Sequence, residues 1–186
     1  MTQRKDDFYL TVSRLVPYKR VDLIVDAFTA MPDRRLFVIG DGPAARRVGA
    51  TAGSNVTLLG HQPDGVVRDY MQRARAFIFA AAEDFGIAPL EAQACGTPVI
   101  ALGCGALRET IRGMDHPEPT GIFYDAPKVK DLCSAVARFE QDGHRIVPAA
   151  CRLNAERFAS ERFRAAFADA LNRAWRSHSL LQPAPV

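Results

Sequence analysis

The sequence lacks any long apolar run. No uninterrupted stretch approaches the roughly 20 residues that a membrane-spanning helix requires,. The first seven residues, MTQRKDD, carry charges with no apolar segment directly behind them, which is unlike a secretory signal peptide,. These two absences lead us to expect a cytoplasmic protein.

Closely spaced cysteines are also missing. The four cysteines are scattered along the chain, without the short spacing of a zinc site, and they are Cys95, Cys104, Cys133 and Cys151. We interpret them as small, buried residues with free thiols. Free thiols are typical of a reducing compartment, in agreement with the expected cytoplasmic location.

The chain has few lysines and only a small net charge. The chain has 4 lysines against 20 arginines, and its net charge of +3 is scattered. No dense basic run with interleaved aromatics indicates a nucleic-acid partner. The small positive balance suits a phosphate-bearing ligand and equally an ordinary solvated surface. With 186 residues, 48% of them hydrophobic, the chain is long enough for one domain with its own core,.

Short apolar runs alternate with segments of helical periodicity. The expected strands are residues 8–13, 36–39, 55–59, 76–80, 98–102 and 121–124. The expected helices are residues 20–31, 44–52, 66–74, a short one opening at Pro89, 106–112, 128–141 and a helix-rich region from residue 148, with residues 180–186 as a frayed tail. This alternation predicts an α/β fold: a Rossmann-like, doubly wound parallel sheet of about six strands with helices on both faces and C-terminal helices. Such sheets bind ligands at the carboxyl ends of their strands.

The loop after the first expected strand carries two cations, Arg14 and Lys19, on either side of Pro17. Arginine binds phosphate oxygens as a planar fork and lysine binds them as a point charge, so together they suit a diphosphate. The alternative is that both side chains simply point into solvent.

The loop after the fourth expected strand carries two acids, Glu83 and Glu91, with Gly86 between them. A carboxylate can accept two hydrogen bonds from neighbouring hydroxyls of a sugar or ribose. Gly86 allows a ligand to approach the backbone closely, and a helix opening at Pro89 offers free N–H groups to an anion. Separately, Glu83 also fits an exposed loop acid, and Glu91 fits a first-turn glutamate that suits the helix dipole.

Two further loops carry weaker signals. Residues 40–43, Gly-Asp-Gly-Pro, lack the third glycine of a dinucleotide-binding turn and also fit a tight turn before a helix,. His61 follows the third expected strand, where a nucleobase fits, although a lone loop histidine is more often structural or solvated.

Three segments together resemble a known family. They are SRLVPYKRVDLIVDAF (13–28), GDGP (40–43) and EDFGIAPLEAQACGTPVIA (83–101). They are similar to the C-terminal domain of the family 4 retaining glycosyltransferases of GT-B architecture, and the similarity extends from Phe8 to about Trp175. Within that family, the chain most resembles mannosyltransferases of bacterial O-antigen and other surface polysaccharides.

The resemblance implies the organisation of the whole enzyme. Residues 1–186 would form a single donor-binding domain, and the N-terminal acceptor domain would be absent, which would leave the isolated chain inactive. The implied donor is a nucleoside diphosphate sugar, with GDP-mannose favoured over UDP-sugars. The implied acceptor is a glycan or lipid-linked glycan held by the other domain. The resemblance implies no cofactor, no metal, no nucleic acid, and a cytoplasmic enzyme that can lie peripherally at the inner membrane face.

The resemblance also implies roles for individual residues. Arg14 and Lys19 would grip the diphosphate and stabilise the leaving group, and Glu83 would contact the donor sugar. Glu91 would accept the ribose hydroxyls. The segment along sugar and phosphates would be Phe85, Gly86, Ile87 and Ala88, and the positions bordering the base would be Gly40 and His61. Cys104 departs from the expected glycine-rich turn, which leaves the sugar contact of that loop open.

Two other functions remain open at this stage. A glycoside hydrolase would use Glu83 and Glu91 as its carboxyl pair, separated by roughly 5–5.5 Å or 6.5–9.5 Å. A free-standing module would bind the nucleotide sugar without catalysis.

The last helical stretch carries one apolar stripe, Phe163, Phe167, Leu171 and Trp175. We expect it to pack on its own domain. Docking to the acceptor domain is the next interpretation, and membrane insertion is the least favoured, because the opposite face mixes acidic and basic residues.

Overall fold

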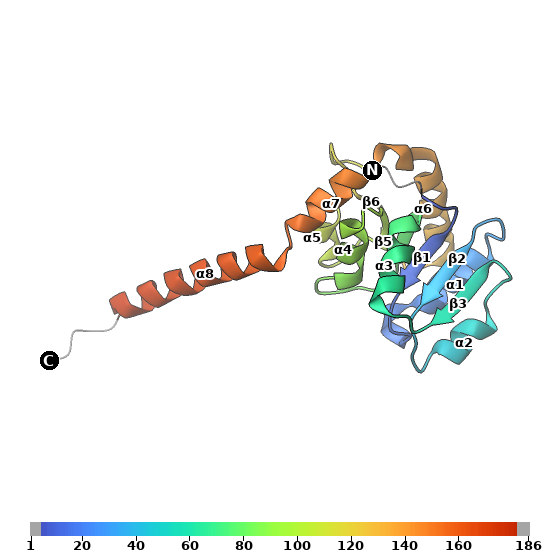
Figure 1. The fold of residues 1–186 in the computed structure, drawn as a ribbon, viewed down its shortest axis with the longest axis horizontal. Helices are drawn as coiled ribbons and strands as arrows, with labels where there is room; N and C mark the ends of the chain where they lie inside the picture. Colours follow the sequence, from blue (N-terminus) through green and yellow to red (C-terminus); the bar gives the residue numbers. More distant parts are fainter. Residues whose placement is uncertain (1–4, 182–186) are drawn as a thin grey trace. The chain divides into compact units, whose positions relative to one another are not determined.

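The computed structural model describes residues 5–181 of the chain. A six-stranded parallel sheet forms its centre, with strand order β3-β2-β1-β4-β5-β6 (Figure 1). The strands are β1 (Tyr9–Val12), β2 (Leu36–Ile39), β3 (Val56–Gly60), β4 (Ala76–Phe79), β5 (Val99–Leu102) and β6 (Gly121–Tyr124). This order and the parallel pairing confirm the predicted doubly wound, Rossmann-like fold,.

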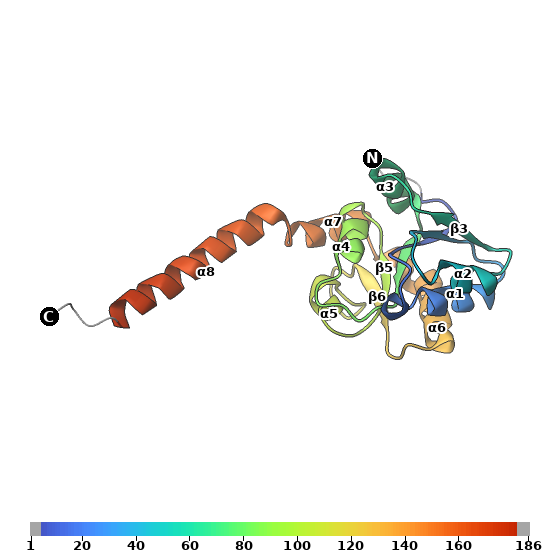
Figure 2. The ribbon, with the colours of Figure 1, turned by 90° about the horizontal axis from the view of Figure 1, so that it is seen from below.

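Helices cover both faces of the sheet, as Figure 2 shows for α3 on one side and α1, α2 and α6 on the other. The helices are α1 (Val21–Thr29), α2 (Ala45–Ala50), α3 (Asp64–Arg73), α4 (Ile87–Ala94), α5 (Leu107–Thr110), α6 (Val129–Asp142), α7 (Pro148–Glu156) and α8 (Ser160–Leu181). One apolar layer packs strands against α1, α2 and α6, and the second packs them against α3, α4 and α5.

The central strands explain why the sheet is covered on both faces. All four residues of β4, AFIF, and all four of β5, VIAL, are buried. Their side chains alternate between the layers: Ile78 and Ile100 belong to the first, whereas Phe77 and Val99 belong to the second,. Continuous apolar runs of this kind are stable only with helices on each side.

The side on which successive strands are added changes between β1 and β4, which are parallel neighbours in the sheet although two strands separate them in sequence. Tyr9 pairs with Leu36 on one side and with Ala76 on the other. The β1 loop turns toward one half of the sheet and the β4 loop toward the other. A crevice at the carboxyl ends of these two strands is the expected ligand position in such a fold.

One prediction about the central segment is wrong. Helix α4 begins at Ile87, two residues before Pro89, because Gly86 adopts a left-handed conformation (φ 81°) that starts the helix earlier. Glu91 therefore lies in the second turn of α4 and not in the first. The remaining expected elements are present, with ends that differ by one or a few residues.

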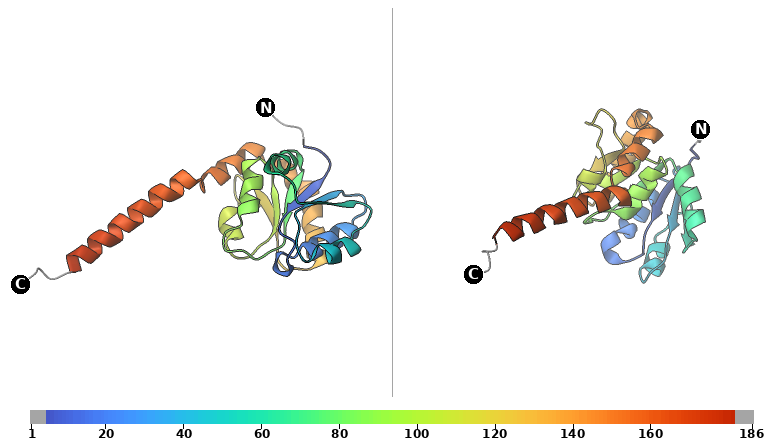
Figure 3. Two further views of the ribbon diagram at one scale, coloured as in Figure 1. Left: turned by 60° about the horizontal axis from the view of Figure 1, so that its bottom comes forward. Right: turned by 60° about the vertical axis from the view of Figure 1, so that its left-hand side comes forward.

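The C-terminal part, Glu156–Val186, forms a separate compact unit and contains α8. Figure 3 shows α8 as one continuous helix. Its apolar stripe is more than half exposed at each position, namely Phe163, Phe167, Leu171 and Trp175. The rings of Phe163 and Phe167 stack at 5.7 Å. Which surface the stripe covers stays a prediction.

Within the described residues, no helix combines the length and apolar character that crossing a bilayer requires. Helix α8 continues through Leu181, so residues 180 and 181, expected in a frayed tail, belong to the helix. Residues 182–186 of that tail, and residues 1–4 of the charged beginning, lie outside the described part.

Candidate functional site

The ammonium group of Lys19 contacts Oε1 of Glu83 in an ion pair at the carboxyl ends of β1 and β4. Lys19 ends a short 3-10 turn, Pro17–Lys19, in the loop after β1, and Glu83 lies in the loop after β4. Their side chains are only 18% and 20% exposed. The structure thus brings together two predicted site residues at the position where this fold binds ligands.

The backbone around Lys19 forms a tight, hydrogen-bonded turn. Its amide donates to the Val16 carbonyl (3.1 Å), and the next residue, Arg20, adopts a left-handed conformation at φ 52°. Such a conformation is uncommon for a residue with a side chain and persists where the surroundings enforce it. The ammonium also lies 5.0 Å from the ring of Tyr18 and 5.9 Å from that of Phe79, within cation–π range,.

The loop after β2 supports the Lys19 loop from the side. The Leu15 amide donates to the Asp41 carbonyl (2.9 Å), and the Ala44 amide donates to the Leu15 carbonyl (2.9 Å). A β-carbon at Gly42 would stand 2.5 Å from the Leu15 carbonyl oxygen, and Gly40 is similarly constrained. Residues 40–43 therefore hold the Lys19 loop in place, which accounts for their glycines without a bound nucleotide. The role of Gly40 beside a base stays a prediction.

The loop after β5 holds Glu83. The Ala106 amide donates to the Glu83 carbonyl (3.3 Å), and a β-carbon at Gly105 (φ 57°) would stand 2.9 Å from that oxygen. Cys104, the departure from the family pattern, is half-buried and packs against the core, so Gly105 makes the close approach. The Glu83 carboxylate is thus carried by a fixed backbone.

The start of α4 offers hydrogen-bond donors beside Glu83. The amides of Ile87 and Ala88 lie in the first turn, where no carbonyl four residues earlier belongs to the helix, and Pro89 has no amide hydrogen,. A β-carbon at Gly86 would stand 2.8 Å from a Leu107 methyl carbon, so the tight turn requires glycine there. Phe85 and Ile87 are 45% and 66% exposed. This segment can receive an anion at its free amides.

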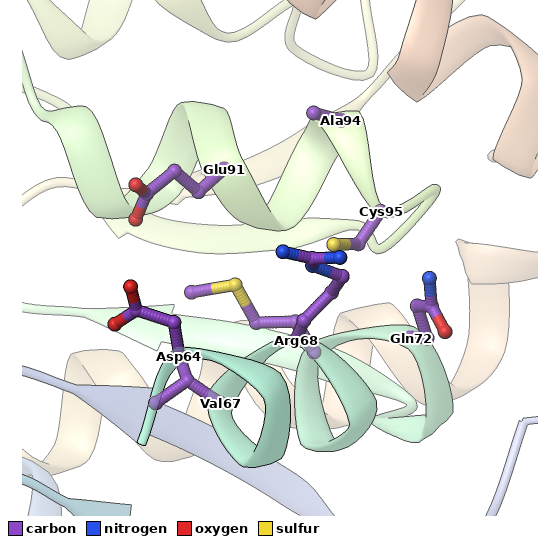
Figure 4. Close-up of a pocket in the computed structure, with 8 residues that line it drawn as sticks. Asp64, Val67, Arg68, Gln72, Glu91, Ala94 and Cys95 are labelled. Carbon is purple, nitrogen blue, oxygen red and sulfur yellow. The ribbon is translucent and has the colours of Figure 1, made fainter. Parts of the chain in front are cut away.

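The Glu91 carboxylate lies on the side of α4 that faces α3, near the Asp64 carboxylate (Figure 4). It lines a pocket of about 460 Å³ between α3 and α4, together with Asp64, Arg68 and Cys95 among others. Desolvation raises the pKa of the Glu91 carboxyl group, and the negative charge of Asp64 raises it further,. The two acids of the central segment therefore have different surroundings: Glu83 faces a cation, and Glu91 faces another acid.

The remaining predicted site residues, Arg14 and His61, are exposed in the loops after β1 and β3. Their side chains are not part of the Lys19–Glu83 contact. Both loops lie at the carboxyl edge of the sheet, on the same edge as Lys19 and Glu83. The structure therefore places both at the carboxyl edge of the sheet, and their roles stay predictions.

Sequence reasoning missed Asp64 and Arg68 as neighbours of Glu91. Asp64 is the first residue of α3, directly after the loop that contains His61, and Arg68 follows one turn later on the same face,. The signal was present, because Asp64 begins a helix at the ligand edge of the sheet. The packing of α3 beside α4 was not predictable from spacing within either helix.

The sequence matches a known protein family. The sequence model of the family described as "Glycosyl transferases group 1" matches residues 2–158. A D-inositol 3-phosphate glycosyltransferase of Mycobacterium sp. (strain KMS) is 33% identical over 137 residues, covering 67% of this chain and 30% of that protein. A GDP-mannose-dependent monoacylated alpha-(1-6)-phosphatidylinositol monomannoside mannosyltransferase of Corynebacterium glutamicum is 35% identical over 145 residues, covering 70% and 37%.

Solved structures share the fold. The sucrose-phosphate synthase of Thermosynechococcus elongatus superposes with a TM-score of 0.77 at 25% identity, over 92% of this chain and 46% of that one. Anabaena Alr3699/HepE, solved in complex with UDP and glucose, superposes with a TM-score of 0.71 at 22% identity, over 90% and 48%.

The chain spans about a third of the length of the curated relatives it matches, namely 30% and 37% of the two proteins above. It spans a little under half of each of the two solved structures, 46% and 48%. The family match, by contrast, covers most of this chain, from residue 2 to residue 158. The chain therefore belongs to the group 1 glycosyl transferases, and its six-stranded sheet has the Rossmann-like fold of their GT-B relatives.

Proposed function

We propose that this chain is the donor-binding half of a retaining glycosyltransferase and that its donor is a nucleoside diphosphate sugar, GDP-mannose. The observation that carries the proposal is the Lys19–Glu83 contact at the carboxyl ends of β1 and β4, where the order of the strands changes side. A cation for phosphate and an acid for sugar hydroxyls meet at one point, as a sugar attached to a diphosphate requires.

Lys19 and Arg14 bind the diphosphate in this proposal, together with the free amides of Ile87 and Ala88. When the bond between the anomeric carbon and the phosphate oxygen breaks, the electron pair stays on that oxygen. Fixed cations and amides that face this position stabilise the developing charge. The acceptor hydroxyl attacks from the same face, and its proton passes to the departing phosphate. This chemistry is proposed to proceed without a metal.

The two acids bind different hydroxyls of the donor. Glu83 accepts hydrogen bonds from the sugar, because it lies beside the cation that holds the phosphate attached to that sugar. Glu91 accepts hydrogen bonds from the ribose. It lies one helical turn after Ile87, the first residue of α4. Partial burial makes these hydrogen bonds stronger than they would be in open solvent.

Asp64 favours guanine as the base. It lines the same pocket as Glu91, at the first turn of α3. A carboxylate only accepts hydrogen bonds, and the Watson–Crick edge of guanine presents two neighbouring N–H groups that it can bind, whereas uracil presents one. The Corynebacterium glutamicum relative, named as GDP-mannose-dependent, supports the same choice. Gly40 and His61 border the base from the neighbouring loops.

The acceptor is proposed to be a glycan or lipid-linked glycan held by a second domain outside this sequence. Coverage of about a third of the curated relatives supports that division. On this proposal the isolated chain binds donor but does not transfer sugar, and the complete enzyme contributes to polysaccharide biosynthesis.

A thermal-shift panel of GDP-, UDP- and ADP-sugars on this chain tests the proposal. We expect the largest increase in Tm with GDP-mannose, and a clearly smaller increase in a Lys19→Ala variant at the same ligand concentration. Stabilisation by a UDP-sugar alone would reject the base assignment. Absence of stabilisation by every nucleotide would reject the function, and release of sugar from an oligosaccharide would favour the hydrolase.

A further inference from the structure

Lys19 and Glu83 bind each other in the structure, yet the proposed function assigns them to different parts of one substrate. Lys19 binds the diphosphate, and Glu83 binds the sugar. A nucleoside diphosphate sugar supplies a new partner to both groups. A free nucleoside diphosphate supplies one only to Lys19 and leaves Glu83 beside an additional negative charge.

We propose that Glu83 competes with the diphosphate for Lys19 and thereby makes the site prefer the sugar-bearing substrate over the nucleoside diphosphate product. The inference rests on the proposed function. Glu83 is then a specificity-determining residue as well as a sugar contact, and it promotes release of the product once the sugar has left.

The surroundings of the Lys19–Glu83 ion pair indicate which side chain moves when a diphosphate binds. The Glu83 backbone is held by the Ala106 amide and by the close approach of Gly105, so its carboxylate extends from a fixed point on a side chain shorter than that of lysine. The Lys19 ammonium stands on a flexible four-carbon stem beside the rings of Tyr18 and Phe79,. In this proposal the Lys19 side chain turns between two anions, the Glu83 carboxylate and the arriving diphosphate.

The competition has a measurable size. Some ligands bind only when Lys19 is free of Glu83. The apparent affinity of such a ligand is its intrinsic affinity multiplied by the fraction of molecules in which Lys19 is free. For an ion pair with about one fifth of each side chain exposed, release of Lys19 corresponds to roughly a two- to tenfold gain in affinity. Glu83→Gln should therefore bind the nucleoside diphosphate two- to tenfold more tightly. It should not bind the nucleotide sugar more tightly, because the amide is a weaker acceptor for the sugar hydroxyls.

The neighbouring Asp84 provides a matched control. It is an exposed acid in the same loop, one residue from Glu83, and it lies outside the ion pair. Asp84→Asn removes one negative charge from the loop without freeing Lys19. A general effect of loop charge would change both variants equally, whereas the proposed competition changes Glu83→Gln alone.

Calorimetric titration of the chain with GDP and UDP tests the inference. The nucleoside diphosphate that binds more tightly decides which nucleotide sugar is titrated next, GDP-mannose or UDP-glucose. We expect Glu83→Gln to tighten binding of the nucleoside diphosphate two- to tenfold, and Asp84→Asn to leave its affinity within twofold of wild type. When Lys19→Gln is combined with Glu83→Gln, the gain in affinity should disappear. Unchanged or weaker nucleotide binding by Glu83→Gln, an equal gain in Asp84→Asn, or a gain that survives Lys19→Gln would overturn the inference.

Failure of the inference and failure of the proposed function give different results. If the wild-type chain binds neither GDP nor UDP, the proposed function is wrong and the inference falls with it. If the wild type binds and Lys19→Gln weakens binding while Glu83→Gln does not strengthen it, only the inference is wrong. If the circular-dichroism spectrum shows that Glu83→Gln does not fold, Glu83→Asp, whose side chain is one methylene shorter, replaces it. We expect a smaller gain in nucleotide affinity from Glu83→Asp, and the absence of any gain would count against the inference.

Discussion

Gly40 lies so close to Ser13 that a β-carbon at position 40 would stand 1.9 Å from the Ser13 carbonyl oxygen. Its φ of +129° is also a conformation that residues with side chains rarely adopt,. The Gly40 amide donates to the Gly60 carbonyl (2.8 Å), and the Ser13 amide donates to the Ile39 carbonyl (3.0 Å). The loops after β1, β2 and β3 are therefore joined at one glycine, next to the loop that carries Lys19.

Gly40→Ala should destabilise the chain by more than about 2 kcal/mol, because the added methyl group meets backbone and the left-handed conformation is strained. Urea denaturation measures the change. Gly65→Ala is the matched control: Gly65 is exposed within α3, and a β-carbon there meets nothing within 4 Å. The control should gain about 0.5–1 kcal/mol from helix propensity. Equal stability of both variants would show that residue 40 does not clamp the loops.

Lys19→Ala should weaken binding of GDP by about ten- to a hundredfold, the scale of one charge-assisted hydrogen bond. It should change the free energy of unfolding by no more than about 1 kcal/mol, because the ion pair with Glu83 is partly exposed. Calorimetry and urea denaturation give the two quantities. Lys130→Ala, which removes an exposed lysine from α6, should change neither. Wild-type GDP affinity in Lys19→Ala would remove its diphosphate role.

The first strand and its cationic loop were largely predictable from sequence, because their signals are local. The apolar run at residues 8–13 and the pair Arg14 and Lys19 stand within one short segment. The contact between Lys19 and Glu83 was not predictable from spacing, since 64 residues separate them and only the strand order brings their loops together. The family resemblance supplied roles for both residues without stating that they touch.

The beginning of α4 shows a second limit. Proline is common in the first turn of a helix, so Pro89 was a reasonable start. The left-handed Gly86, packed against Leu107 from a distant segment, starts the helix earlier and turns Glu91 toward α3. Tertiary packing therefore decides which way the second acid faces, and the pocket with Asp64 follows from that.

Asp64→Asn should weaken GDP binding by about five- to fiftyfold and leave UDP binding within about threefold, because an amide cannot accept from two guanine N–H groups in the same way. Calorimetric titration with both nucleotides measures the ratio. The same substitution removes a negative charge beside Glu91 and should lower the pKa of that carboxyl group, which NMR titration follows,. Parallel losses for GDP and UDP would contradict a role in base selection.

Glu91→Ala should weaken binding of GDP by about five- to fiftyfold, since two ribose hydroxyls lose their acceptor. The loss should be similar for UDP, because the ribose is common to both nucleotides. A 2′-deoxy nucleotide keeps only the 3′-hydroxyl, so its affinity should fall less between wild type and variant than that of GDP. Unchanged affinity of Glu91→Ala for GDP would count against the ribose contact.

Glu140 joins α6 to the sheet at a distance from the site. Arg34 donates to both of its carboxylate oxygens (2.9 and 2.7 Å), and the Tyr9 hydroxyl donates to one of them (2.9 Å). Desolvation raises the pKa of the Glu140 carboxyl group, but hydrogen bonds from Arg34 and Tyr9 outweigh it, and the net shift is downward from 4.5. A carboxyl group with a lowered pKa stabilises the fold above its unfolded pKa, and this stabilisation is lost as the pH falls.

Glu140→Gln should therefore reduce the free energy of unfolding at pH 7 by about 1–3 kcal/mol, and the difference from wild type should shrink as the pH falls below 4.5,. Urea denaturation at pH 7, 5 and 3.5 measures it. Glu118→Gln, in an exposed pair with Arg112, should cost less than about 1 kcal/mol,. A Glu140→Gln deficit that stays constant down to pH 3.5 would contradict the stabilising role of the ionised carboxylate.

Amide chemical-shift mapping of the 186-residue chain during titration with GDP tests the central claim most directly. A nucleoside diphosphate bound at the carboxyl ends of β1 and β4 should shift the amide signals of Lys19, Gly86, Ile87 and Ala88 most strongly. A second group of shifts should appear at Asp64 and Glu91. The opposite edge of the sheet, around Lys5 and Arg73, should stay unchanged. Shifts concentrated at that opposite edge, or no shifts at saturating GDP and UDP, would contradict the assignment of the site.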